Sequence, residues 1–112
     1  MRSLRAKSKA FAVRCVRLCR YLSETRHEHR LSPRLLRSGT RIGADVWRSC
    51  AAQTRSGYLK SIHAALPEAY RTANLLERLY VRGYLSRTGF DSIYGDCQAL
   101  IGMLEAGVLA SP

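Results

Sequence analysis

Acidic residues are scarce in this 112-residue chain, which has 8 Asp and Glu against 19 Lys and Arg and a net charge of +11. Long apolar runs are also missing, because Arg or Lys interrupts every such stretch of the first half. None approaches the roughly 20 residues that a membrane-spanning helix needs. The basic first helix has one Phe and no Trp to anchor it in lipid, so we expect no contact with a membrane surface either. The first 22 residues are rich in Arg and free of acids, like organellar presequences, but no small-residue cleavage site follows an apolar core. We expect this segment to belong to the mature domain.

Paired cysteine motifs are absent as well. The four cysteines are Cys15, Cys19, Cys50 and Cys97. They include no C-x-x-C pair, which favours a reducing compartment and a cytoplasmic protein. A metal site would have to combine Cys15 and Cys19 with His27 and His29. Because free cysteine usually behaves as a small buried hydrophobe, we expect neither a metal nor any other cofactor.

Apolar residues at three- and four-residue steps predict four amphipathic helices. Their expected ranges are 3–24, 33–53, 55–82 and 87–108. Ser32 is the expected N-cap of the second helix, with Pro33 at its first position, and Thr54 and Ser86 are the expected N-caps of the next two. Gly83 is the expected C′ residue of the third helix. Pro67 lies inside that helix, where we expect a kink rather than a break.

Each predicted helix has one apolar side, and short connections join the helices. On the second helix that side holds Leu35, Leu36, Gly39, Ile42, Gly43, Val46 and Cys50. One domain, residues 1–112, is therefore expected to form an all-α, up-down-up-down antiparallel four-helix bundle.

The stretch RSGTRIGADV, Arg37 to Val46, contains two glycines but lacks the Lys and Ser or Thr of a phosphate-binding loop. Gly39 and Gly43 instead fall on the apolar side of the second helix. Two glycines inside a helix cost up to about 1 kcal/mol each relative to Ala. Their spacing of four residues predicts that another helix backbone packs closely against them.

Basic residues concentrate in the first half of the chain. Residues 1–55 hold 14 Lys and Arg against 3 acids, whereas residues 56–112 hold 5 of each. The candidate nucleic-acid-binding residues are Arg34, Arg37, Arg41, Arg48 and Arg55 along the second helix, and Lys9, Arg17 and Arg20 on the first. They predict a surface that binds phosphates with little sequence preference. The alternative is a merely solvated helix face, on which Asp45 pairs with Arg41 or Arg48.

Three apolar residues lie outside the predicted core faces. Val13, Val16 and Trp47 are therefore candidate subunit contacts. We find no nucleophile beside a base and no pair of facing carboxylates, so we expect no catalytic residues and no enzyme activity.

The sequence resembles a family of small bacterial four-helix-bundle proteins. The resemblance rests on LLRSGTRIGADV (35–46), AAQTRSGYLKSIHAALPEA (51–69) and LLERLYVRGYL (75–85). This family includes proteins encoded in intervening sequences of large-subunit ribosomal RNA genes, and accessory variability determinants of diversity-generating retroelements. The resemblance implies a homopentameric ring and, for the retroelement branch, binding to a reverse transcriptase and to nucleic acid. It implies no assigned role for the ribosomal branch.

Together these features predict a non-enzymatic, homo-oligomeric accessory protein that binds RNA or DNA through its Arg-rich helix faces, beside a reverse transcriptase. The alternative is an oligomeric interaction scaffold that binds an acidic protein surface and has no role with nucleic acid.

Overall fold

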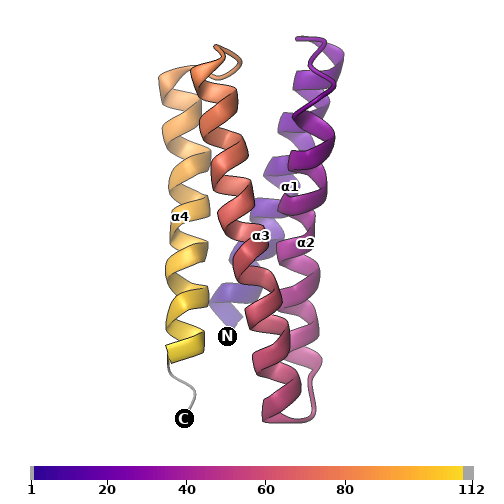
Figure 1. Ribbon diagram of the computed structural model, residues 1–112, viewed down its shortest axis with the longest axis vertical. Helices are drawn as coiled ribbons and strands as arrows, with labels where there is room; N and C mark the ends of the chain where they lie inside the picture. The colour runs from indigo at the N-terminus through magenta and orange to yellow at the C-terminus, as the bar shows by residue number, and fades with distance from the viewer. Residues whose placement is uncertain (1, 110–112) are drawn as a thin grey trace.

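Four helices form an antiparallel, up-down-up-down bundle in the computed structural model (Figure 1), which describes the backbone of residues 2–109 and the side chains of residues 4–108. They are α1 (Arg2–Glu24), α2 (Ser32–Ala51), α3 (Arg55–Val81) and α4 (Arg87–Leu109). The bundle measures 44 × 20 × 19 Å, and each helix packs against its two neighbours in the order α1, α2, α3, α4 and back to α1. In the part of the chain described, no helix is long and apolar enough to cross a membrane.

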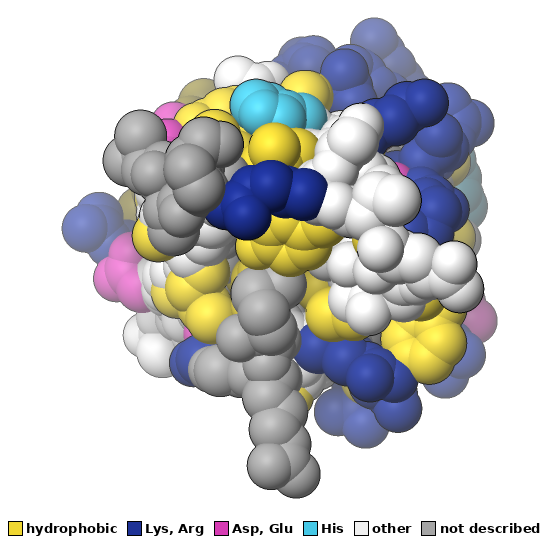
Figure 2. Space-filling view, turned by 90° about the horizontal axis from the view of Figure 1, so that it is seen from below, with side chains coloured by type: hydrophobic (Ala, Val, Ile, Leu, Met, Phe, Trp, Pro, Cys, Tyr) yellow, Lys and Arg dark blue, Asp and Glu magenta, His cyan; other side chains and the backbone are white. Residues whose placement is uncertain are grey.

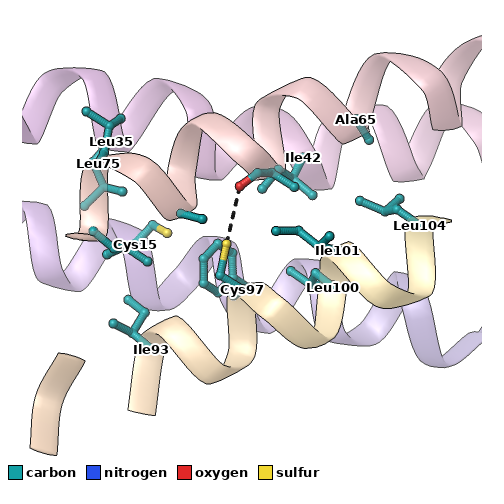
Figure 3. Packing of buried hydrophobic residues seen from close by; sticks show 14 of the residues in the cluster. Cys15, Leu35, Ile42, Ala65, Leu75, Ile93, Cys97, Leu100, Ile101 and Leu104 are labelled. Carbon is teal, nitrogen blue, oxygen red and sulfur yellow. Dashed lines mark hydrogen bonds between the residues drawn. The ribbon is translucent and has the colours of Figure 1, made fainter. Parts of the chain in front are cut away.

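The core runs along the bundle axis. It consists mainly of aliphatic side chains, with three buried thiols among them. Figure 3 shows Cys15 of α1 and Cys97 of α4 among leucines and isoleucines of the other helices. The Cys97 thiol donates a hydrogen bond of 3.5 Å to the Ala69 carbonyl (Figure 3), and the Cys19 thiol donates one of 3.2 Å to the Ser32 carbonyl. The thiols of Cys19 and Cys97 fill space in the core as small hydrophobic side chains do, and each S–H group has a carbonyl acceptor.

The two glycines of α2 have different surroundings. A Cβ added at Gly39 would lie 2.5 Å from the Cys15 Sγ and 2.9 Å from the Cys15 Cβ, so α1 leaves no room for a side chain there. At Gly43 the nearest atom would be the Ser8 carbonyl oxygen at 3.6 Å, which is an ordinary contact. The close approach of α1 and α2 therefore requires glycine at position 39 but not at position 43.

The connection between α1 and α2 contains a capping residue that the sequence analysis missed. Glu28 is buried, and its carboxylate accepts hydrogen bonds from the backbone N–H groups of Arg30, Leu31 and Ser32. Ser32 is not the N-cap that we predicted: it is the first residue of α2, and its hydroxyl donates to the Glu28 carbonyl. A side chain that reaches forward from the preceding turn thus accepts hydrogen bonds from the first N–H group of α2 and from those of the two residues before it.

Hydrogen bonding to that cap outweighs burial in setting its protonation. Burial alone raises the pKa of Glu28, but the three backbone N–H groups favour the charged form, and the net result is a lowered pKa. The first turn of α2 is therefore held by a carboxylate that stays ionised at neutral pH.

The remaining predicted caps are confirmed. Thr54 accepts a hydrogen bond from the Gly57 N–H, and Ser86 accepts one from the Gly89 N–H. Gly83 follows α3 with a φ of +84°, and the neighbouring Tyr84 N–H bonds back to the Leu79 carbonyl, which completes a Schellman motif. α3 continues through Pro67 without a break.

Two residues that we placed on the apolar side of α2 lie at the surface instead. Leu36 is 40% exposed, and Cys50 is also exposed. Their helical positions lie at the edge of the apolar side, where the exact rotation of α2 about its axis decides burial. The side that packs inward is centred on Leu35, Ile42 and Val46, which are fully buried.

Candidate nucleic-acid interface

All eight predicted phosphate-binding residues have exposed side chains. Four lie on α2, namely Arg34, Arg37, Arg41 and Arg48, and three lie on α1, namely Lys9, Arg17 and Arg20. The eighth, Arg55, does not continue the series on α2, because that helix ends at Ala51 and Arg55 is the first residue of α3. The seven-residue repeat therefore places three guanidinium groups on one helix, and the fourth lies beyond a turn.

Ion pairing separates Arg48 from the other seven. Its guanidinium pairs with Asp45, which was predicted to pair with either Arg41 or Arg48. The Asp45 carboxylate is buried and does not lie on the exposed side of the helix. Among the residues whose side chains are described, no carboxylate forms an ion pair with any of the remaining seven. The basic face of α1 and α2 thus carries charge that the protein does not neutralise. We call this face, made by Lys9, Arg17, Arg20, Arg34, Arg37, Arg41 and Arg48, the basic face.

Most of the few acids in the first half are not accessible to the basic side chains of the surface. Residues 4–55 hold three acids. Glu28 and Asp45 are only 6% and 2% exposed, whereas Glu24 is exposed at the surface. Figure 2 looks along the bundle onto the end that holds the turn between α2 and α3, and shows many more basic than acidic side chains.

A groove of about 650 Å³ lies between the C-terminal half of α2 and the first half of α3. Arg41 and Arg48 line it from α2, and Lys60 lines it from α3. The sequence pattern does not single out Lys60, because this residue lies outside the basic first half of the chain, in a segment that holds equal numbers of basic and acidic residues. Only the antiparallel packing of α3 against α2 brings it to the basic face.

Two smaller grooves, of about 380 Å³ each, separate the outer sides of α1 and α2. Lys9 and Trp47 line one of them, and Val16, Arg20 and Leu36 line the other. The Arg5 guanidinium lies 4.1 Å from the centre of the Trp47 ring, in a cation–π contact. The predicted subunit contacts Val13, Val16 and Trp47 are 43%, 38% and 56% exposed in the single chain, so each is available for a partner.

The buried thiols are not reactive groups. Burial raises the pKa of Cys19 and of Cys97 to about 12 each, and it raises the pKa of Cys15 further. A thiol that stays protonated at neutral pH is a poor nucleophile and a poor metal ligand. Their arrangement supports a packing role.

Comparison with known proteins identifies the family. A sequence model described as "23S rRNA-intervening sequence protein" matches residues 3–106. The crystal structure of a protein of unknown function from the S23 ribosomal protein family of Bacteroides thetaiotaomicron is 33% identical to this chain, covers 97% of each chain and superposes with a TM-score of 0.94. No curated protein matches this sequence. The chain therefore belongs to the 23S rRNA-intervening sequence protein family.

Proposed function

We propose that this chain is a non-enzymatic, homo-oligomeric accessory protein that binds the phosphates of RNA or DNA through its basic face. The observation that carries the proposal is the lack of internal neutralisation. Six of the seven side chains of the basic face pair with no described carboxylate, and two of the three acids in the same half are buried. A polyanion would supply the missing negative charge.

The chemistry of the basic face fits phosphate better than it fits a base edge. Six of its seven members are Arg, whose planar guanidinium binds phosphate through two hydrogen bonds. Binding of this kind gains free energy from the release of counterions and discriminates little between sequences.

Self-association would repeat this face several times. We propose that Val13, Val16 and Leu36 contact another copy of the chain, since they form exposed apolar surface on α1 and α2. The family resemblance suggests a pentamer, and for its retroelement branch a reverse transcriptase as the protein partner. A ring would raise the avidity for a long nucleic acid without any new type of contact.

The test of nucleic-acid binding compares two double variants with the same change of charge. Arg34 and Arg37 replaced by Glu alter the basic face, whereas Lys7 and Arg82 replaced by Glu alter exposed side chains outside it. Binding of short RNA and DNA is measured across a salt series. We expect the first variant to lower the slope of log affinity against log salt by about two, since each lost phosphate contact removes about 0.9 from B-DNA binding.

Two results would overturn this proposal. One is equal loss of affinity in both double variants, which would mean that total charge matters and the basic face does not. The other is the absence of nucleic-acid binding by a folded wild-type oligomer, together with capture of an acidic protein; this outcome would favour the interaction scaffold.

The subunit contact is tested separately by sedimentation at micromolar concentration. We expect the wild type to sediment as an oligomer, and a variant with Val16→Glu and Leu36→Glu to sediment as a folded monomer. A matched change at another exposed apolar residue, Val81→Glu, should leave the oligomer intact. A monomeric wild type would contradict the proposal of a ring.

A further inference from the structure

The groove between α2 and α3 is larger than either groove between α1 and α2. Its walls include four small residues, Ala51, Ala52, Gly57 and Ala64. Because these residues have little or no side chain, the two helices leave an open hollow where longer side chains would fill the space. At about 650 Å³ the hollow lies within the roughly 300 to 1,000 Å³ that small-ligand pockets occupy.

The charge around this hollow favours an anion. Arg41 and Arg48 on one wall line the same hollow as Lys60 on the other, and Ser61 also lines it. A phosphate inside the groove would therefore meet cations from two helices, which a phosphate lying on one helix face would not.

The two acids of the groove do not cancel this charge. Asp45 is buried against Arg48, and Glu68 pairs with Arg71 of the next helical turn. Arg41 and Lys60 have no described carboxylate as an ion-pair partner. The net charge available to a ligand thus comes from two groups that line the groove from different helices, Arg41 on α2 and Lys60 on α3.

Trp47 lies on the rim of the same groove. Its side chain is 56% exposed, and the Arg5 guanidinium covers the indole from the α1 side. An exposed aromatic ring beside a basic groove is the combination by which proteins bind single strands, since every base can stack on the ring.

Resting on the proposed function, we propose that the α2–α3 groove binds a single-stranded segment of nucleic acid, with its phosphates between Arg41 and Lys60 and an unpaired base stacked on Trp47. A duplex keeps its bases stacked inside and offers none to the indole. An acidic peptide would use the cations but would leave the ring unused. The proposal gives Trp47 a ligand-binding role in place of the subunit contact predicted from the sequence.

The chain carries its own probe for this contact, because Trp47 is its only tryptophan. Titration of the full-length protein with a short oligouridylate should quench the indole emission in a saturable and salt-dependent way. A duplex of the same length should bind the basic face and change the emission little. The DNA counterpart, a short oligothymidylate, is expected to behave like the RNA because neither stacking nor phosphate contact requires the 2′-hydroxyl.

Lys60→Glu is the decisive variant, and Arg82→Glu is its matched control. Both residues are exposed, and both changes reverse one charge. Arg82 directly follows α3, whose C-terminal end lies at the opposite end of the bundle from the α2–α3 turn (Figure 1). We expect Lys60→Glu to weaken single-strand binding by about tenfold and Arg82→Glu by less than about twofold. Circular dichroism establishes that both variants remain helical.

Three outcomes would overturn the inference. If the oligonucleotide binds without quenching Trp47, and both variants lose equal affinity, nucleic acid binds elsewhere and the proposed function survives. If no nucleic acid binds at all, the proposed function itself fails. If a polyglutamate peptide quenches the indole and displaces the oligonucleotide from the wild type but not from Lys60→Glu, the groove is a site for acidic protein segments.

Discussion

The two halves of this bundle use their acidic residues in opposite ways. In the α1–α2 half, Glu28 and Asp45 are buried, where one holds the start of α2 and the other pairs with Arg48. In the α3–α4 half none of the five acids is buried, and each has a partner. These partners are Arg71 for Glu68, Tyr94 for Glu77, Arg87 for Asp91, Arg14 for Asp96 and Tyr70 for Glu105.

The difference shows that the position of a charge matters as much as its number. A buried acid that already has hydrogen-bond or ion-pair partners is not available to other cations of the surface. The first half therefore presents surplus positive charge, whereas residues 56–112 hold equal numbers of acidic and basic residues and keep their acids accessible at the surface. The proposed binding sites follow this division, with Lys60 as the contribution of α3.

The largest expected effect comes from removing the buried cap of the basic half. Glu28→Ala leaves the backbone N–H groups of Arg30, Leu31 and Ser32, at the start of α2, without their acceptor, and we expect it to lower the free energy of unfolding by about 2 to 3 kcal/mol. The matched change in the other half is Glu77→Ala, where the exposed carboxylate accepts one long hydrogen bond of 3.3 Å from Tyr94. Urea denaturation should show a loss below about 1 kcal/mol for that variant. Equal losses of unfolding free energy in the two variants would contradict the different roles of acidic residues in the two halves.

The pH dependence sharpens the same comparison. Because the pKa of Glu28 is lowered on folding, its contribution is fully present above the unfolded-state value of about 4.3 and is lost as the pH falls through the folded-state value. Wild-type stability should therefore decline in acid more steeply than that of Glu28→Gln, which has no charge to lose there. Parallel curves of unfolding free energy against pH for the two proteins would exclude this role.

Glycine substitutions probe how tightly each half is packed. Gly39→Ala forces a Cβ against Cys15, and we expect a loss of about 1 to 2 kcal/mol after the gain in helix propensity is included. Gly102→Ala on α4 meets no atom within 4 Å and should stabilise the protein by up to about 1 kcal/mol. Thermal unfolding measures both, and the two shifts should have opposite signs.

A coupling measurement then assigns the cause of the loss at position 39. Cys15→Ala removes the sulfur that lies nearest to the added Cβ, so the double variant should recover part of the stability that Gly39→Ala loses. Simple additivity of the two single changes would show that the strain arises elsewhere.

The smallest expected effect concerns the contact between the two halves. Arg14 of α1 and Asp96 of α4 pair at 2.6 Å, and their side chains are 39% and 51% exposed to solvent. We expect Asp96→Asn to cost about 0.2 to 1 kcal/mol and to become neutral at high salt. A larger loss in a denaturant titration would mean that this pair helps to hold the two halves together.

Much of the fold could be predicted because its signals are local. Apolar spacing located all four helices, and Thr54, Gly83 and Ser86 marked their ends through contacts with residues a few positions away. Glu28 escaped because SETRHEHR has no apolar rhythm, and a carboxylate that reaches forward four residues leaves no standard capping pattern. Leu36 and Cys50 were predicted to lie on the apolar side of α2 but are exposed, because a small rotation of the helix decides which edge of that side is covered.

The sequence by itself determined the class of fold, the helix ends marked by Thr54, Gly83 and Ser86, and the uneven distribution of positive charge, because these depend on composition and on contacts between residues near in the chain. The tertiary structure alone decided which glycine contacts α1, which acids leave the surface, and which cation of α3 faces Arg41 and Arg48. Each of these depends on the rotation and approach of two helices, and residues distant in the chain fix both through the way they pack.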